Sequence, residues 1–114
     1  MAMELLVEKA GDVTVVVPKA EFLDANTSRE FRDELPAALG AGGKVVLDLR
    51  HVQFMDSGGC GAVLAVLKRL KASGGDLKIC CVTNPVRALF DLVRMQRIIE
   101  VFKTREEAVA ALEK

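Results

Sequence analysis

Short apolar runs alternate with longer stretches of mixed polar and apolar residues along this chain. The runs at residues 44–49 and 77–82 contain few polar residues, as expected for strands that are buried on both faces. A stretch with helical spacing of its apolar residues, at about residues 58–73, connects these two runs. Two such strands joined by a helix predict a right-handed βαβ unit in which the strands are parallel.

Two further apolar runs stand near the start of the chain, at residues 3–7 and 13–17. The polar segment between them contains Gly11 and Asp12, which are residue types that favour tight turns. Pro18 closes the second run, because proline has no N–H to donate to a neighbouring strand. This pattern predicts a β-hairpin, followed by an irregular segment over residues 19–26.

Helix starts are indicated at three further places. Two capping boxes, in which a threonine precedes a glutamate by three residues, begin at Thr27 and Thr104. Thr83 and Asn84 followed by Pro85 predict a short helix that ends at Phe90 or Leu92, because proline is tolerated in the first helical turn. The apolar residues expected to face the core from the two capping-box helices are Phe31, Leu35, Ala38, Leu39, Ala108, Val109 and Leu112.

Pro36 lies inside the pattern of the helix that starts at Thr27, and we expect a kink or a late irregularity there. The glycine-rich segment 40–43 then ends this helix, and a last strand-like run occupies residues 97–102. The predicted order of elements is β-β-α-β-α-β-α-β-α, in one α/β domain over residues 1–114.

Asp56 and Ser57 lie where a polar connection becomes the helix that begins near Gly58. The start of a helix has unpaired N–H groups and the positive end of the helix dipole, so an anion there is stabilised. Gly58 and Gly59 follow, although glycine costs about 1 kcal/mol relative to alanine at a helical position. They suggest a close approach by a partner or a phosphate, or else relief of close packing. Ser57 is the candidate functional residue, and a simple helix cap is the alternative.

The segment 54–61, Phe-Met-Asp-Ser-Gly-Gly-Cys-Gly, stands between an apolar strand and an apolar helix. It resembles the STAS domain, and more narrowly the bacterial anti-sigma factor antagonists. The signature of that family is an Asp-Ser pair, a second hydroxyl residue and then Gly-Leu-Gly. Asp56, Ser57 and Gly61 match, whereas the second hydroxyl position holds Gly59 and the leucine position holds Cys60. The resemblance covers nearly the whole chain and implies a mixed β-sheet with helices packed mainly on one side.

The resemblance implies a phospho-switchable binding module with no catalysis of its own. In that family a partner that is both kinase and anti-sigma factor phosphorylates the serine after the aspartate, here Ser57. Unphosphorylated, the chain is expected to bind this partner and release a sigma factor, and a separate serine phosphatase would restore this form. The partner supplies ATP and Mg²⁺, so no cofactor is expected in this chain, which has no Walker-type loop. The residues expected at the partner-binding face are Asp24, Asn26, Asp56, Ser57, Gly58 and Gly59.

Composition narrows the possible partners. Sixteen basic and sixteen acidic residues cancel, so the chain lacks the basic patch that a nucleic-acid-binding protein needs. No apolar run approaches the roughly 20 residues of a membrane span. The N-terminus shows no basic region followed by an apolar stretch, so we expect a cytoplasmic protein.

Cys60, Cys80 and Cys81 are the only cysteines. Neighbouring residues on a strand point to opposite faces, so Cys80 and Cys81 are not expected to share a partner or a metal ion. His51 is the only histidine, and a zinc site is therefore not expected either. We interpret all three thiols as reduced and largely buried.

Two enzymatic readings and one binding alternative remain. Cys81 and Arg87 have the spacing of cysteine-dependent phosphatases, but Pro85 removes an N–H from a loop that would need many, and the loop has no glycine. A serine hydrolase would need a Gly-x-Ser-x-Gly elbow around Ser57, with His51 as its base, and the elbow is absent. We therefore expect no enzyme. A STAS scaffold or transport-complex subunit that is never phosphorylated is the other non-enzymatic alternative.

Overall fold

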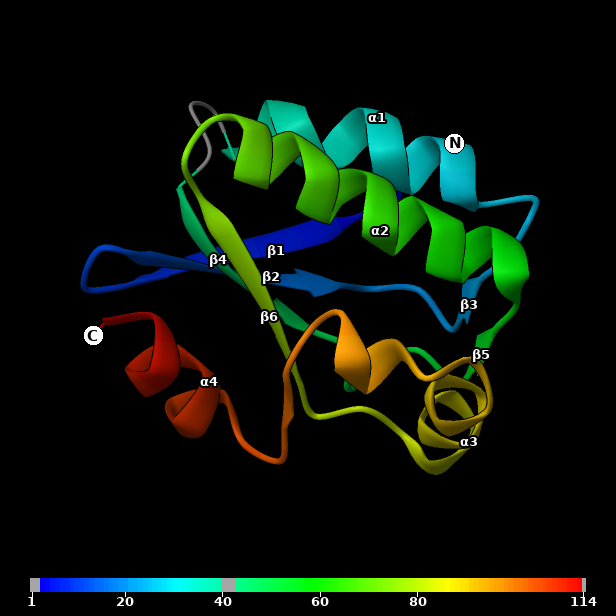
Figure 1. Cartoon of the computed structure of the whole chain (residues 1–114). Helices are drawn as coiled ribbons and strands as arrows, with labels where there is room; N and C mark the ends of the chain where they lie inside the picture. Colours follow the sequence, from blue (N-terminus) through cyan, green and yellow to red (C-terminus); the bar gives the residue numbers. More distant parts are fainter. Residues whose placement is uncertain (1–2, 40–42, 114) are drawn as a thin grey trace.

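The computed structural model describes residues 3–39 and 43–113, which form a five-stranded sheet, a separate two-stranded sheet and four α-helices (Figure 1). The strands of the larger sheet run in the spatial order β1 (Leu5–Ala10), β2 (Val13–Pro18), β4 (Lys44–Asp48), β6 (Asp76–Cys80) and β7 (Val101–Phe102). The smaller sheet consists of β3 (Phe22–Leu23) and β5 (Phe54–Met55). The helices are α1 (Ser28–Leu39), α2 (Ser57–Ala72), α3 (Asn84–Val93) and α4 (Arg105–Glu113), with a 3₁₀ turn at Met95–Arg97.

The larger sheet is mixed. β1 and β2 pair antiparallel as the predicted hairpin, and the pairs β2–β4, β4–β6 and β6–β7 are parallel. The parallel pairing of β4 and β6 through α2 confirms this part of the predicted βαβ unit. Because parallel strands end at the same edge of a sheet, the segments that follow β4 and β6 lie close together.

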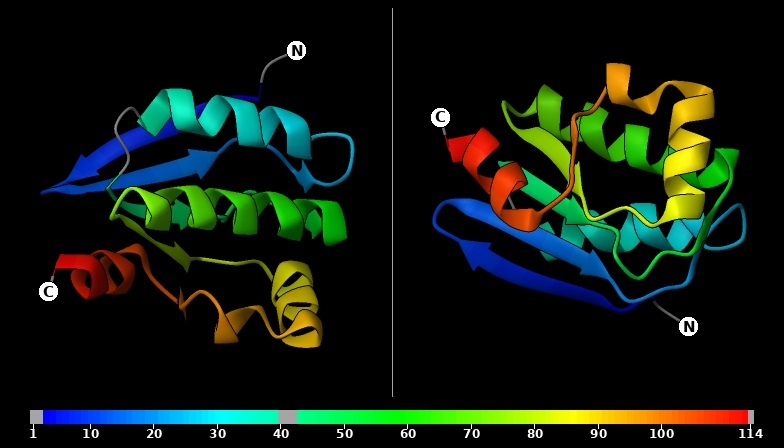
Figure 2. Two further views of the ribbon diagram at one scale, coloured as in Figure 1. Left: turned by 45° about the horizontal axis from the view of Figure 1, so that its top comes forward. Right: turned by 90° about the horizontal axis from the view of Figure 1, so that it is seen from below.

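The helices cover the two faces of the sheet unequally. α1 and α2 lie side by side over one face, and α4 alone covers the opposite face (Figure 2). Successive residues of β2 point to opposite faces, so Val16 belongs to the core under α1 and α2 whereas Val15 packs against α4. Both faces are covered, which is why the central strands are mostly apolar. The structure confirms the predicted mixed α/β fold with helices mainly on one side.

The first strand differs from its predicted bounds. It begins at Leu5 and continues through Glu8 and Lys9 to Ala10, although these two residues are charged. β1 is an edge strand with mostly exposed side chains, so its cross-strand pairing tolerates charges that the sequence pattern assigned to the turn. The turn itself is at Gly11, whose φ of +65° requires glycine or a similarly tolerant residue.

The segment 19–26 was predicted to be irregular, yet it contains β3, which pairs parallel with β5. Two residues are too few to show a strand period, so the sequence carries no sign of this sheet. The capping box predicted at Thr27 also differs. The Thr27 hydroxyl donates to the Phe22 carbonyl at 3.1 Å and accepts from the Asp24 N–H at 3.0 Å, so it stabilises the loop before α1 rather than the helix start.

α1 continues through Pro36 to Leu39, and Phe31 and Leu35 are buried as predicted. The side chain of Ala38, a predicted core position, is not described, and the predicted helix stop at residues 40–42 lies outside the described residues. At the other end of the chain the predicted strand 97–102 is shorter than expected. α3 ends at Val93, Arg94 follows with a left-handed φ of +58°, and the 3₁₀ turn comes next. Of the predicted strand, Val101 and Phe102 pair with β6.

The capping box at Thr104 is confirmed. The Thr104 N–H donates to the Glu107 carboxylate at 3.2 Å, and the Glu107 N–H donates back to the Thr104 hydroxyl at 3.1 Å. Ala108 and Leu112 of this helix are buried against the α4 face of the sheet, and Val109 packs at its margin.

Candidate functional site

The start of α2 is capped by Asp56 and not by Ser57. Asp56 has the extended backbone of an N-cap residue (φ −119°, ψ −170°), and its carboxylate accepts the Gly59 N–H at 3.0 Å. Ser57 is the first residue of the helix, and its side chain is exposed. Within the part of the chain that the structure describes, its hydroxyl makes no hydrogen bond. The alternative that Ser57 serves as the helix cap is therefore not supported.

The loop before α1 is attached to this helix start. The Ala25 N–H donates to the second carboxylate oxygen of Asp56 at 3.2 Å, so one side chain joins the loop to α2. Asp24 and Asn26 flank that contact, and Asn26 is exposed. The Asp24 carboxylate accepts from the N–H groups of Asn26 and Thr27 at 3.0 and 3.1 Å, which closes a turn within the loop. The structure thus brings the predicted loop and helix residues together, with the Asp24 charge engaged in its own loop.

The two glycines after Ser57 have a structural explanation. A Cβ on Gly59 would overlap the Leu23 carbonyl oxygen and approach Met55 Cγ to 2.7 Å. A Cβ on Gly58 would lie 3.0 Å from the Ala25 Cα. The glycines therefore allow β3 and the loop to pack against α2, as the packing alternative expects. Gly59 is buried, and its place in the predicted partner-binding face stays a prediction.

The electrostatics of the helix start favour negative charge. Donation by the Gly59 N–H lowers the pKa of Asp56 below its usual value, against a smaller opposing effect of desolvation, and the Ala25 and Gly58 N–H groups add to the lowering. The helix dipole acts in the same direction. Ser57 therefore has a permanently ionised carboxylate as its neighbour at neutral pH.

A pair of exposed aromatic side chains near this helix start was not predicted from the sequence. Phe22 of β3 and Phe54 of β5 are register partners that are 51% and 47% exposed, and their ring centroids lie 6.2 Å apart. Leu23 and Met55, the next residue on each strand, point to the opposite face and are buried. The exposure of the two rings depends on a sheet of two-residue strands, which leaves no period in the sequence. β5 leads directly into Asp56, so Phe54 lies three residues before Ser57 in the chain.

The prediction that Cys80 and Cys81 point apart is wrong. β6 ends at Cys80, and Cys81 has the left-handed φ of +61°, so the alternation of a strand does not apply to it. The two sulfur atoms and an Asp48 carboxylate oxygen all lie within 4.8 Å of one another. Cys60 and Cys80 are buried, and burial raises the pKa of both thiols.

The enzymatic alternatives find no support in the geometry. The residues between Cys81 and Arg87 do not form an open loop, because α3 begins at Asn84 and the Arg87 N–H already bonds to the Thr83 carbonyl at 2.9 Å. His51 is exposed beside a hollow of about 330 Å³ that Lys19, Glu21 and Arg50 also line. In residues 3–39 and 43–113, no hydrogen bond joins His51 to Ser57.

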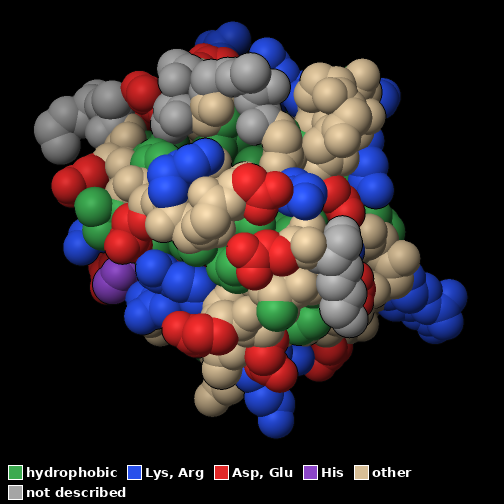
Figure 3. All heavy atoms as spheres, turned by 90° about the vertical axis from the view of Figure 1, so that its left-hand side faces the viewer, with side chains coloured by type: hydrophobic (Ala, Val, Ile, Leu, Met, Phe, Trp, Pro, Cys, Tyr) green, Lys and Arg blue, Asp and Glu red, His purple; other side chains and the backbone are tan. Residues whose placement is uncertain are grey.

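Two general surface features bear on partners. Lys and Arg side chains interleave with Asp and Glu side chains over the face shown in Figure 3, in keeping with the zero formal net charge. No helix among the described residues is both long enough and apolar enough to cross a bilayer.

Comparison with known proteins places this fold in a family. A family model for the STAS domain matches residues 4–108. The anti-sigma F factor antagonist of Paenibacillus polymyxa is 30% identical over 115 residues, which cover 99% of this chain and 97% of that protein. A solved anti-sigma factor antagonist of Thermotoga maritima has a TM-score of 0.87 and 24% identity, with 96% of this chain and 95% of that chain covered. The Bacillus cell fate determinant SpoIIAA in its phosphorylated form has a TM-score of 0.67 and 22% identity, over 95% and 98% of the two chains. With a family match over most of its length, the chain belongs to the STAS domain family.

Proposed function

We propose that this chain is an anti-sigma factor antagonist whose binding is switched off by phosphorylation of Ser57. The observation that carries the proposal is the position of Ser57, which is exposed at the first position of α2 while Asp56 performs the capping. Its hydroxyl is thus available to a kinase without loss of the helix cap. The Paenibacillus polymyxa relative is named for the same role, and SpoIIAA, which shares the fold, was solved in a phosphorylated form.

The partner surface consists of three adjoining parts: Ser57 with Asp56, the loop 24–26, and the aromatic pair Phe22–Phe54. Aromatic side chains carry a large share of the binding energy in many interfaces, because they bury a wide area at little cost in side-chain entropy. Two half-exposed rings beside a phosphorylatable serine therefore give an anti-sigma factor an apolar anchor next to a charge-sensitive contact.

Phosphorylation affects the interface and not the fold. A phosphate adds about −1.5 to −2 charges at neutral pH. At the first turn of a helix this charge is worth about 0.3–1 kcal/mol in the favourable direction. Across an interface the phosphate and the ionised Asp56 would be desolvated together, and one such uncompensated contact costs about 3 kcal/mol, or a little over a hundredfold in affinity.

The kinase in this scheme is the anti-sigma factor itself, which supplies ATP and Mg²⁺, and a separate serine phosphatase restores the binding form. The chain needs no catalytic group of its own. A STAS scaffold or transport-complex subunit that is never phosphorylated is the competing function.

The proposal is tested by measuring the intact mass of the chain and its affinity for the anti-sigma factor. The chain is incubated with ATP, Mg²⁺ and an anti-sigma factor kinase from the same genome, and the addition of one phosphate is read by mass spectrometry. Ser57→Ala should abolish the addition and retain binding, whereas Ser73→Ala, at the exposed end of α2, should behave like the parent chain. Ser57→Asp should fold normally and bind at least about a hundredfold more weakly. Equal affinities for Ser57→Ala and Ser57→Asp would refute the switch and leave the scaffold function.

A further inference from the structure

A cluster of potential metal ligands lies at the ends of β4 and β6, outside the surface discussed above. Asp48 and Cys80 are register partners in the parallel pair β4–β6, and Cys81 follows directly. One carboxylate oxygen and the two sulfur atoms lie within 4.8 Å of one another. The backbone holds them there, because the Leu49 N–H donates to the Cys80 carbonyl and the Cys81 N–H donates to the Phe102 carbonyl, each at 3.1 Å.

The spacing of the two thiols suits a bridging ion better than a disulfide. Adjacent Cα atoms are about 3.8 Å apart, which is shorter than the roughly 4.4–6.8 Å that disulfides normally span. A tetrahedral ion with Zn–S bonds of about 2.3 Å holds two thiolates about 3.8 Å apart, which is within the observed limit of 4.8 Å. The pair is therefore arranged to chelate a thiophilic cation.

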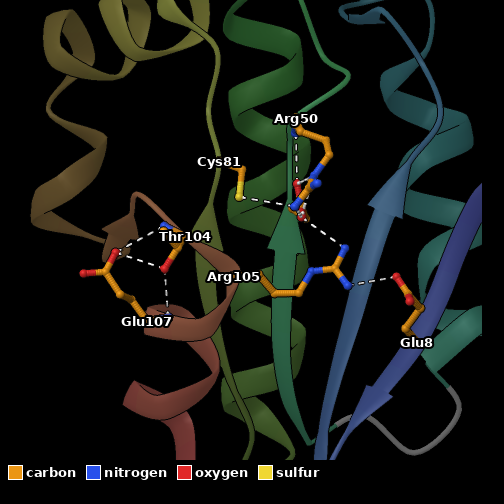
Figure 4. A network of polar contacts seen from close by, with 7 residues as sticks. Glu8, Arg50, Cys81, Thr104, Arg105 and Glu107 are labelled. Carbon is orange, nitrogen blue, oxygen red and sulfur yellow. Dashed lines mark hydrogen bonds and ion pairs between the residues drawn. The ribbon is translucent and has the colours of Figure 1, made fainter.

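Arg50 occupies the position between these ligands (Figure 4). Its Nη2 atom donates to Asp48 Oδ2 at 2.8 Å and to Cys81 Sγ at 3.7 Å, and its Nε atom donates to both carboxylate oxygens at 3.0 Å. A guanidinium group thus already bridges two of the three ligands as a cation would. The Arg50 side chain is 48% exposed, so it can move into solvent without opening the core. Arg105, which contacts Asp48 at 3.3 Å, is also paired with Glu8 at 3.0 Å.

We propose that Asp48, Cys80 and Cys81 bind a soft divalent cation of the Zn²⁺ class, and that Arg50 is the group that this cation displaces. Binding converts both thiols to thiolates and releases two protons, so the added charge of the cation is balanced within the site. The carboxylate is the third ligand, and a water molecule completes the tetrahedron. This proposal does not depend on the function proposed for Ser57.

The probe is Cd²⁺, whose bonds to thiolates give an ultraviolet charge-transfer absorption. The full chain, kept reduced with a phosphine, is titrated with Cd²⁺, and the absorption should saturate at one ion per chain. Cys81→Ser should weaken binding at least about tenfold, and Cys60→Ala, which removes the thiol outside the cluster, should leave it unchanged. Arg50→Ala should tighten binding severalfold, because the carboxylate and Cys81 no longer have a competing cation.

Several results would overturn the proposal. A parent chain that shows no thiolate absorption with Cd²⁺ has no such site. Equal absorption in Cys81→Ser, with its fold checked by circular dichroism, places the ion elsewhere. An unchanged or weaker affinity in Arg50→Ala shows that Arg50 is not the displaced group. Zn²⁺ should compete for the site of the bound Cd²⁺. Its affinity should rank the variants in the same order as the affinity for Cd²⁺, with Arg50→Ala highest, the parent chain and Cys60→Ala next, and Cys81→Ser lowest.

Discussion

Replacement of Gly59 by alanine tests the packing of β3 against α2. The added Cβ would overlap the Leu23 carbonyl oxygen and come within 2.7 Å of Met55 Cγ and 2.9 Å of the Leu23 carbonyl carbon. The backbone of β3 would have to move, and overpacking of this kind costs about 1–3 kcal/mol or more. The better helix propensity of alanine returns at most about 1 kcal/mol. We therefore expect Gly59→Ala to destabilise the domain by about 1–2 kcal/mol.

Gly61 gives a matched control in the same helix. A Cβ at Gly61 would have no neighbour within 4 Å among the described residues, and the position is exposed. Gly61→Ala should therefore stabilise the domain by up to about 1 kcal/mol. The assay is urea unfolding monitored by circular dichroism. If the dependence of the unfolding free energy on urea concentration is the same in each variant, a shift in midpoint reports a change in stability.

The result that would refute this reasoning is a Gly59→Ala variant as stable as Gly61→Ala. The close approach of Leu23 would then not constrain the helix start. If Gly59→Ala is destabilised as expected, its folded fraction should also bind the anti-sigma factor more weakly, because β3 carries Phe22 and continues into the loop 24–26.

Four other outcomes are expected. Phe54→Ala should weaken anti-sigma factor binding at least about tenfold in surface plasmon resonance with little change in unfolding midpoint, since the ring is half exposed; a loss of stability instead would make the aromatic pair structural. Asp24→Asn keeps an acceptor for the turn and removes the charge, so it should retain stability and weaken binding, and equal binding would exclude this charge from the interface. Burial opposes ionisation of Asp48, but its bonds and charge interaction with Arg50, together with Arg105, hold the pKa of its carboxyl below its usual value. The stability that the lowered pKa of Asp48 gives to the fold is present above about pH 4 and is lost as the pH falls. Arg105→Gln should therefore raise the midpoint pH of acid unfolding. An unchanged midpoint would count against a contribution from the Arg105–Asp48 pair. Cys81→Ser should leave anti-sigma factor binding intact. If the parent chain hydrolysed an aryl phosphate and Cys81→Ser did not, the binding-only function would be contradicted.

Interactions between residues close in sequence could be predicted well. The capping box of Thr104 and Glu107 closes within one helical turn, and the structure contains both of its hydrogen bonds. The apolar runs of β2, β4 and β6 are also expressed locally, because strands buried on both faces need continuous apolar side chains. The position of Asp56 and Ser57 at a helix start follows from the same kind of pattern. Thr83 shows the limit of local signals. It is an N-cap as predicted, but its hydroxyl donates to the Val52 carbonyl at 2.7 Å and accepts no N–H from its own helix.

The tertiary structure alone decided what surrounds Ser57. Phe22 and Phe54 are far apart in the chain, and only the pairing of β3 with β5 makes them one exposed surface. The same pairing brings the Leu23 carbonyl against Gly59, where a larger side chain would not fit. Cys80 and Cys81 meet Asp48 because β6 ends between them and lies beside β4. Each of these features depends on contacts between distant segments, which impose no period or spacing on the sequence, whereas caps and buried strands depend on neighbours that the sequence places side by side.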